Sequence, residues 1–502
     1  MMSPLDAPGS SRSDVVLERV AQLRLEHDLI GDLEVPDEAY FGVHTSRALE
    51  NFNISATPIS AYPAFIDALA TVKQAAAIAN SDTGLLDQER ATAIVSACRR
   101  VRGGEFHDHF VVDAIQGGAG TSTNMNTNEV IANIALVELG YSRGSYQHLH
   151  PLDHVNLGQS TNDVYPTAVK LALDSNVTAL RLALSQLRQA FALKGVEFAD
   201  ILKIGRTQLQ DAVPMTLGQE FAAYAVTLAE DEARLEEARL LLHELNIGGT
   251  AIGTGLNAHP DYRRRALTEL RELTGIDSLV GAEDLIEATQ DVGVFVQLSG
   301  VLKRVAIKLS KICNDLRLLS SGPQAGFGEI NLPPRQAGSS IMPGKVNPVI
   351  PEVVNQIAYE VVGNDVTVSM AAEGGQLQLN AFEPIIAKSL FDSLDHLTAG
   401  VETLRVHCID GITANTERLR DIVAASVGLV TALNPAIGYA SATSIAQQAL
   451  REGRGIVELV LERELLSREQ LDRLLSTSHL TGRPVALAAH QIEDESCRTT
   501  SE

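Results

Sequence analysis

Apolar residues recur at helical spacing through most of the middle of the chain. Over 166–198, leucine and valine positions follow one another every three or four residues, with polar residues between them, and such a period is typical of an amphipathic helix. The same pattern predicts four more long helices, over 217–246, 291–319, about 351–374 and 383–408, and glycine follows each of these within a few residues. At 1.5 Å per residue the five helices are roughly 33–50 Å long. They are therefore expected to pack side by side in an elongated bundle.

The helix predicted over 291–319 carries apolar residues on most of its faces. The positions that go most of the way round it are Val292, Val294, Val296, Leu298, Leu302, Val305, Ile307 and Leu309. A helix that is apolar on most sides is buried on most sides. We therefore expect bundles from several subunits to pack together.

Shorter elements flank the predicted bundle. Before it, 40–43 is strand- or turn-like, and 63–80 reads as a helix that Ser60 is placed to cap. After it, the pattern predicts three short helices, over 441–452, 455–463 and 467–475. The change from short elements to long helices, and back to short elements, predicts three domains, 1–161, 162–410 and 411–502. The ends, 1–14 and 493–502, are expected to be flexible polar tails.

Composition limits the classes of function. The 502 residues are 45% hydrophobic but only 4% aromatic, which favours a core of packed helices. The net charge of −23 argues against a nucleic-acid partner, and an anionic substrate would need cations concentrated locally, for which Arg206 and Lys345 are candidates. The four cysteines lack metal-binding spacing, and neither a signal peptide nor a membrane span is seen. We therefore expect a cytoplasmic protein with reduced thiols.

The segment 338–348 carries the densest set of reactive side chains and reads GSSIMPGKVNP. Its Pro-Gly pair breaks any regular element, so the segment is predicted to be a loop, and on its own the pattern also fits an ordinary turn. The hydroxyls of Ser339 and Ser340, the cation of Lys345 and the amide of Asn347 can together bind a carboxylate and act on a neighbouring group.

Three other segments are rich in small polar residues. They read GGAGTSTNMNTNE over 117–129, GQSTND over 158–163 and GRTQLQDAVP over 205–214. Glycines let a ligand approach the backbone, while hydroxyls and amides supply hydrogen bonds. The first two segments also fit simple helix caps, and the third fits a solvated loop. Capping and ligand binding are compatible, because a helix N-terminus is itself an anion site.

Together these four segments resemble the characteristic regions of the aspartase/fumarase superfamily, and the resemblance extends over about 20–480. Enzymes of this family release fumarate by eliminating ammonia, water or an amine. The resemblance implies a mainly α, three-domain fold in which five-helix bundles from four subunits form a twenty-helix core. It also implies that each active site of the homotetramer is built from three different subunits. Periodicity alone does not predict the number four.

Details of the motifs resemble the aspartases more than the class II fumarases. The chain reads YFGVHT over 40–45 where fumarases have WGAQT, QSTND where they have QSSND, and NPVIPE where they have NPTQCE; EDLIEAT over 283–289 is also similar to aspartases. The implied substrate is L-aspartate, and the alternative is malate. A catalytically silent scaffold would be expected to have lost the loop 338–348, and a helical interaction module would not need the polar segments.

The resemblance implies a role for each matching residue. Ser339 would be the base that removes the C3 proton. The β-carboxylate would be bound by Thr121, Ser160, Thr161 and Ser340, the α-carboxylate by Lys345 and Asn347, and the amino group by Asn162, Thr207 and Gln208. No cofactor and no catalytic metal are implied; activation by a divalent metal, as in some aspartases, follows from the resemblance alone.

Two positions depart from the commonest pattern of the family. Gln208 stands where fumarases and many aspartases carry histidine, so an amide rather than a titratable imidazole would lie beside the amino group. His150 and His154 lie near the secondary carboxylate site of fumarases. We interpret both histidines as structural.

Overall fold

The computed structural model describes residues 22–481, so the predicted tails 1–14 and 493–502 lie outside the described residues. The N-terminal part contains a hairpin and four helices: β1 (Leu23–Asp28), β2 (Gly31–Pro36), α1 (Val43–Asn51), α2 (Pro63–Asp82), α3 (Gln88–Arg102) and α4 (Thr121–Glu138). A short π-helix, Pro151–Val155, follows. The apolar core of this part continues into the central helices.

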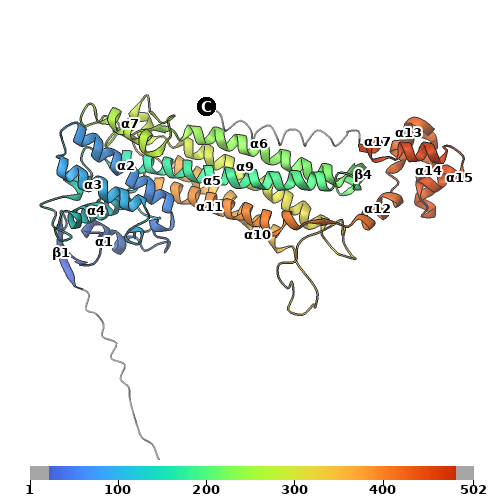
Figure 1. The fold of residues 1–502 in the computed structure, drawn as a ribbon, viewed down its shortest axis with the longest axis horizontal. Coiled ribbons are helices and arrows are strands. Elements are labelled where there is room, and N and C mark those ends of the chain that lie inside the picture. The colour runs from blue at the N-terminus through green and yellow to red at the C-terminus, as the bar shows by residue number, and fades with distance from the viewer. Residues whose placement is uncertain (1–21, 482–502) are drawn as a thin grey trace, which may run out of the picture.

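Five long helices lie side by side in the middle of the molecule (Figure 1). They are α5 (Thr161–Glu197), α6 (Leu217–Leu241), α9 (Gly293–Leu319), α10 (Val349–Glu373) and α11 (Glu383–His407). The elements between them are the hairpin β3 (Leu202–Thr207) and β4 (Gln210–Thr216), β5 (Glu244–Leu245), α7 (Tyr262–Thr274), β6 (Val280–Gly281), α8 (Leu285–Gln290) and β7 (Ile330–Asn331). The predicted long-helix bundle and mainly α fold are therefore confirmed.

The C-terminal part packs at the far end of the bundle from α1–α4 (Figure 1). It contains β8 (Thr413–Ala414), α12 (Thr416–Ala425), α13 (Leu429–Ile437), α14 (Tyr439–Glu452), α15 (Ile456–Glu462), α16 (Arg468–Leu474) and α17 (Thr477–Thr481). Its apolar core is separate from the main one and includes Ile204 of β3. The predicted boundaries near 161 and 410 lie beside the start of α5 and the end of α11; the division into three domains stays a prediction.

The start of α5 differs from the prediction because Pro166 lies inside the helix rather than at its beginning. A proline has no N–H for the carbonyl four residues earlier, which here belongs to Asn162. The side chain of Asn246 supplies the missing donor, with Nδ2 2.9 Å from the Asn162 oxygen. Ser160 and Asp163 form a capping box, so the helix begins at Thr161.

Two smaller predictions are wrong, and a third holds only in its turn alternative. The helix α2 is capped by Tyr62 without a side-chain bond, so Ser60 is not its N-cap; Pro63, which needs no hydrogen-bond acceptor, begins the helix. Of the strand or turn predicted over 40–43, the strand is absent: Tyr40 lies in a bend, and Val43 already belongs to α1. The helix α6 ends at Leu241, because the chain turns into β5, which pairs with β6.

Large apolar side chains are exposed along the sides of the bundle. Leu182 and Leu193 of α5, Val226 of α6, and Tyr359 and Met370 of α10 are each 60% to 65% exposed. Val296 and Ile307 of α9, which the sequence predicts to be buried, also remain exposed in the single chain. Exposed apolar surface of this extent marks contact surfaces. No helix between residues 22 and 481 has the length and apolar character needed to cross a membrane.

Candidate active site

The first group of predicted site residues lies where the N-termini of α4 and α5 meet. Thr121 begins α4, directly after Gly120, whose φ is 86°. A Cβ at Gly120 would lie 2.2 Å from the Tyr165 ring, so glycine is required there. One turn later, Asn124 Nδ2 donates to Thr161 Oγ1 at 3.0 Å. The positive ends of both helix dipoles lie at this point, which favours an anion.

The other two residues of this group are held by local hydrogen bonds. Ser160 Oγ accepts from the Asn162 N–H at 3.2 Å, and the Asp163 carboxylate accepts from the Ser160 N–H at 2.9 Å. The predicted cap is therefore present at Ser160. Asn162 Nδ2 donates to the Ala251 carbonyl at 2.7 Å. One N–H of Asn162 is thus engaged, and its amide oxygen, which bonds to no group between residues 22 and 481, can accept from a ligand.

A buried lysine that sequence reasoning missed supports this group. Lys73 Nζ donates to Asn156 Oδ1 and Gln159 Oε1, both at 2.9 Å, and Asn156 Oδ1 also accepts from Asn124 Nδ2. Burial lowers the pKa of Lys73 to about 7. Burial also raises the pKa of the neighbouring Asp163 to about 6. The only sequence signal was a charged residue within the alanine-rich stretch ATVKQAAA.

The second group, Thr207 and Gln208, lies at the tip of the β3–β4 hairpin. Sequence reasoning expected a loop here. Gln208 and Leu209 have φ values of 53° and 63°, the left-handed geometry of the tight two-residue turns that join strands. Non-glycine residues adopt it at a cost of about 1 kcal/mol or more each, and such strain gathers at functional sites. Both Thr207 and Gln208 are exposed.

The third group lies on the loop 338–347, which projects from the side of the bundle between α9 and α10 (Figure 1). The base of this loop is closed by the Gly338 N–H, which donates to the Lys345 carbonyl at 2.7 Å, and by Asn347 Nδ2, which donates to the Gly338 carbonyl at 2.8 Å. Ser339 Oγ accepts from two backbone N–H groups, of Ile341 at 3.2 Å and of Met342 at 3.0 Å. Ser340 and Lys345 are exposed.

A single chain therefore does not bring all the predicted site residues together. The first two groups lie at opposite ends of α5, whose 37 residues span roughly 55 Å. The three groups are Thr121, Ser160, Thr161 and Asn162; Thr207 and Gln208; and Ser339, Ser340, Lys345 and Asn347. A site that uses all of them needs more than one chain.

Other features of the described residues add no further reactive centre. His150 Nδ1 accepts from the Leu152 and Asp153 N–H groups, and His154 Nδ1 accepts from the His150 N–H, so both rings hold local backbone. Between residues 22 and 481, no group of three or more His, Cys, Asp or Glu could hold a metal ion. The absence of a cofactor stays a prediction.

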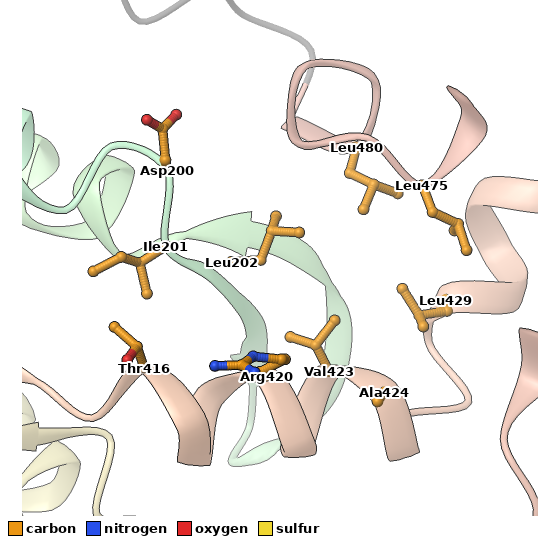
Figure 2. A pocket seen from close by; sticks show the side chains of 10 residues that line it. All are labelled: Asp200, Ile201, Leu202, Thr416, Arg420, Val423, Ala424, Leu429, Leu475 and Leu480. Carbon is orange, nitrogen blue, oxygen red and sulfur yellow. The ribbon is translucent and has the colours of Figure 1, made fainter. Parts of the chain in front are cut away.

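An apolar cavity of about 400 Å³ lies between β3 and the C-terminal helices. Figure 2 shows Leu202 of β3 on one side of it and Leu429, Leu475 and Leu480 on the other. None of the predicted site residues lines it.

Comparison with known proteins places the chain in a family. A family model described as Lyase matches residues 31–363, and one described as Fumarase C C-terminus matches residues 429–482. The aspartate ammonia-lyase of Pseudomonas aeruginosa is 59% identical over 472 residues, which cover 94% of this chain and 99% of that protein. The aspartate ammonia-lyase of Escherichia coli K12 is 54% identical over 459 residues, which cover 91% and 96%.

Solved structures show the same fold. The fumarate lyase:delta crystallin from Brucella melitensis bound to cobalt has a TM-score of 0.89 at 54% identity, covering 91% of this chain and 99% of that one. The recombinant class II fumarase from Schistosoma mansoni has a TM-score of 0.84 at 35% identity, covering 93% and 100%.

The chain belongs to the aspartase/fumarase superfamily of lyases, as its four motifs predict. Within this superfamily it groups with the aspartate ammonia-lyases, of which the relatives compared are 52% to 60% identical to it, against 35% for the fumarase. The predicted preference for the aspartases over the class II fumarases is confirmed.

Proposed function

We propose that the protein catalyses the reversible elimination of ammonia from L-aspartate, giving fumarate through an aci-carboxylate intermediate. The observation that carries this proposal is the position of Ser339, whose Oγ accepts two backbone N–H groups. A serine hydroxyl is a weak base, and donors aimed at its oxygen stabilise the alkoxide it must become. Ser339 is therefore the group that takes the C3 proton.

Removal of that proton places a second negative charge on the β-carboxylate, so the main catalytic task is to stabilise this charge. Thr121, Ser160 and Thr161, at the N-termini of α4 and α5, and Ser340, on the loop, bind this carboxylate. The hydroxyl of Thr161 already accepts from Asn124, which leaves its own hydrogen to donate to the substrate. The positive ends of two helix dipoles add to these hydrogen bonds.

The remaining residues hold the amino group and the α-carboxylate. The free amide oxygen of Asn162, with Thr207 and Gln208, surrounds the ammonium until it leaves as ammonia. Lys345, exposed at the end of the loop, and the second N–H of Asn347 bind the α-carboxylate. No metal and no cofactor takes part in these steps.

We also propose that the active protein is a homotetramer in the cytoplasm, with each active site shared between three chains. Two observations support this: the site residues fall into three separate groups, and the bundle exposes large apolar side chains. Mixing two inactive variants tests it. Ser339→Ala and Thr161→Ala chains, denatured and refolded together, would regain part of the activity, because some hybrid sites contain neither substitution. No regain would mean that each site lies within one chain.

The activity itself is tested by ultraviolet detection of fumarate from L-aspartate, beside a parallel sample with L-malate. We expect fumarate from L-aspartate and none from L-malate. Fumarate from L-malate alone would make the protein a fumarase and refute the proposal.

A further inference from the structure

Four charged side chains form a cluster beside the β3–β4 hairpin. Glu329 is fully buried and Lys203 is 1% exposed. Lys203 Nζ lies 2.8 Å from Glu329 Oε2 and 2.6 Å from Glu220 Oε2, while Arg206 Nη2 lies 2.5 Å from Glu329 Oε1. Two cations and two carboxylates thus balance, and Glu329 alone contacts both cations of the hairpin. A buried charge of this kind is costly unless it is paired.

An irregularity in the β3–β4 hairpin lies between the two cations that reach one carboxylate. Side chains three positions apart point to opposite faces of a regular strand, so Lys203 and Arg206 would face away from each other. The register shifts between Ile204 and Arg206, where Gly205 of β3 faces two residues of β4, Ala212 and Val213. Such a bulge in β4 twists the hairpin locally, and both cations reach Glu329. Gly205 lies in the shift, where a Cβ would come within 3.1 Å of the Met215 sulfur. The hairpin is therefore shaped to aim Arg206 at Glu329.

The segment that carries Glu329 is fixed independently of the hairpin. The Glu329 N–H donates to the Leu319 carbonyl, and the Glu329 carbonyl accepts from the Asn415 N–H, both at 2.9 Å. Immediately afterwards, β7 pairs with β8. Glu329 is thus anchored to the end of α9 and to the C-terminal part, and it stands ten positions before Ser339.

Arg206 transmits the position of Glu329 to the tip of the hairpin. Its guanidinium carbon lies 4.2 Å from the centre of the Phe327 ring, so the same segment holds it from two sides. The next two residues are Thr207 and Gln208. The tight turn leaves little freedom between Arg206 and these side chains.

We propose that Glu329 is a positioning residue for the amine pocket: through Arg206 and Lys203 it sets where Thr207 and Gln208 meet the substrate amino group. This inference rests on the proposed function. Because the carboxylate-binding residues lie on other elements, displacement of the hairpin affects binding of the amine and leaves binding of the two carboxylates intact.

Glu329→Gln tests the proposal, since it keeps the shape and removes the charge. In the reverse reaction we expect the KM for ammonium to rise by about tenfold or more, because small misplacements of a binding group are costly, with the KM for fumarate unchanged. Glu329→Asp, which keeps the charge, should restore part of the ammonium affinity. Glu220→Gln is the matched control, since Glu220 contacts Lys203 but not Arg206, and it should leave both KM values unchanged.

Other outcomes overturn the proposal. If Glu329→Gln changes both KM values equally, or lowers only the melting temperature, Glu329 is structural. If that variant does not fold, Arg206→Lys decides the question. This substitution shortens the side chain that reaches Glu329, at a position that is only partly buried. An unchanged KM for ammonium would then refute the role. If wild-type protein fails to turn over L-aspartate, the proposed function fails instead.

Discussion

Glu383, the first residue of α11, is a buried carboxylate whose ionisation opposes folding. Burial raises the pKa of Glu383 from 4.5 to about 8, while the nearby Lys170 ammonium acts in the opposite direction. A group whose pKa is raised on folding stabilises the folded state below its unfolded pKa, and this contribution is lost as pH rises to the folded pKa. Glu383→Gln keeps the size of the side chain and removes the ionisation.

The size of the effect follows from the two pKa values. At about 1.4 kcal/mol per pKa unit, the full loss between pH 4.5 and 8 is roughly 5 kcal/mol, and the part between pH 5.5 and 8.5 is roughly 3 kcal/mol. Unfolding entropy of about 2.1 cal/mol/K per residue amounts to about 1 kcal/mol per degree for 502 residues. From pH 5.5 to 8.5, the melting temperature of the wild type should therefore fall by about 3 °C relative to that of Glu383→Gln.

Differential scanning calorimetry of both proteins at pH 5.5 and 8.5 measures this difference in melting temperature. Glu402→Gln, an exposed change on the same helix, is the control and should show no pH-dependent difference. A difference between Glu383→Gln and wild type that is the same at both pH values would refute the reasoning, as would a relative loss of stability at pH 8.5.

Three further perturbations act on the proposed active site. Ser339→Ala should lower kcat by about 10²- to 10⁴-fold without changing the melting temperature, because within residues 22–481 Ser339 Oγ bonds only to its own loop; near-normal turnover would contradict its role as the base. Lys345→Met should raise the KM for L-aspartate by about 10- to 100-fold, the value of a hydrogen bond between charged groups, and an unchanged KM would exclude contact with the α-carboxylate. Dialysis against EDTA should leave turnover unchanged, because all the proposed groups are protein side chains; activity lost and then restored by a divalent cation would show that a metal takes part.

The long helices could be predicted from the sequence because their signals are local. Apolar residues repeat at helical spacing, and glycines follow α6, α9, α10 and α11. The start of α5 could not be predicted, because Pro166 is compatible with the helix interior only when Asn246, distant in the sequence, supplies a hydrogen bond. The β3–β4 hairpin was missed because its turn residues, Gln208 and Leu209, are not the asparagine and glycine that favour left-handed backbone.

The candidate site likewise has a part that could be predicted from the sequence and a part that could not. The four polar motifs could be found in the sequence, and the resemblance links them to one family. The groups that support them could not be found, because their partners are distant in the chain. Lys73 reaches Asn156 and Gln159 across 83 and 86 positions, and Glu329 meets Arg206 beside the register shift of the β3–β4 hairpin. The number of chains needed for one site depends on contacts between subunits, which no local pattern contains.

The continuous helix α5 restricts how the gene for such a protein can change. Its N-terminus carries Ser160, Thr161 and Asn162, and the hairpin with Thr207 and Gln208 follows its C-terminus. One codon inserted within α5 would move its two ends apart by about 1.5 Å and rotate them by about 100°. Insertions and deletions are therefore expected to accumulate in exposed connections such as 283–284, whereas the number of codons for α5 stays constant among descendants that keep the activity.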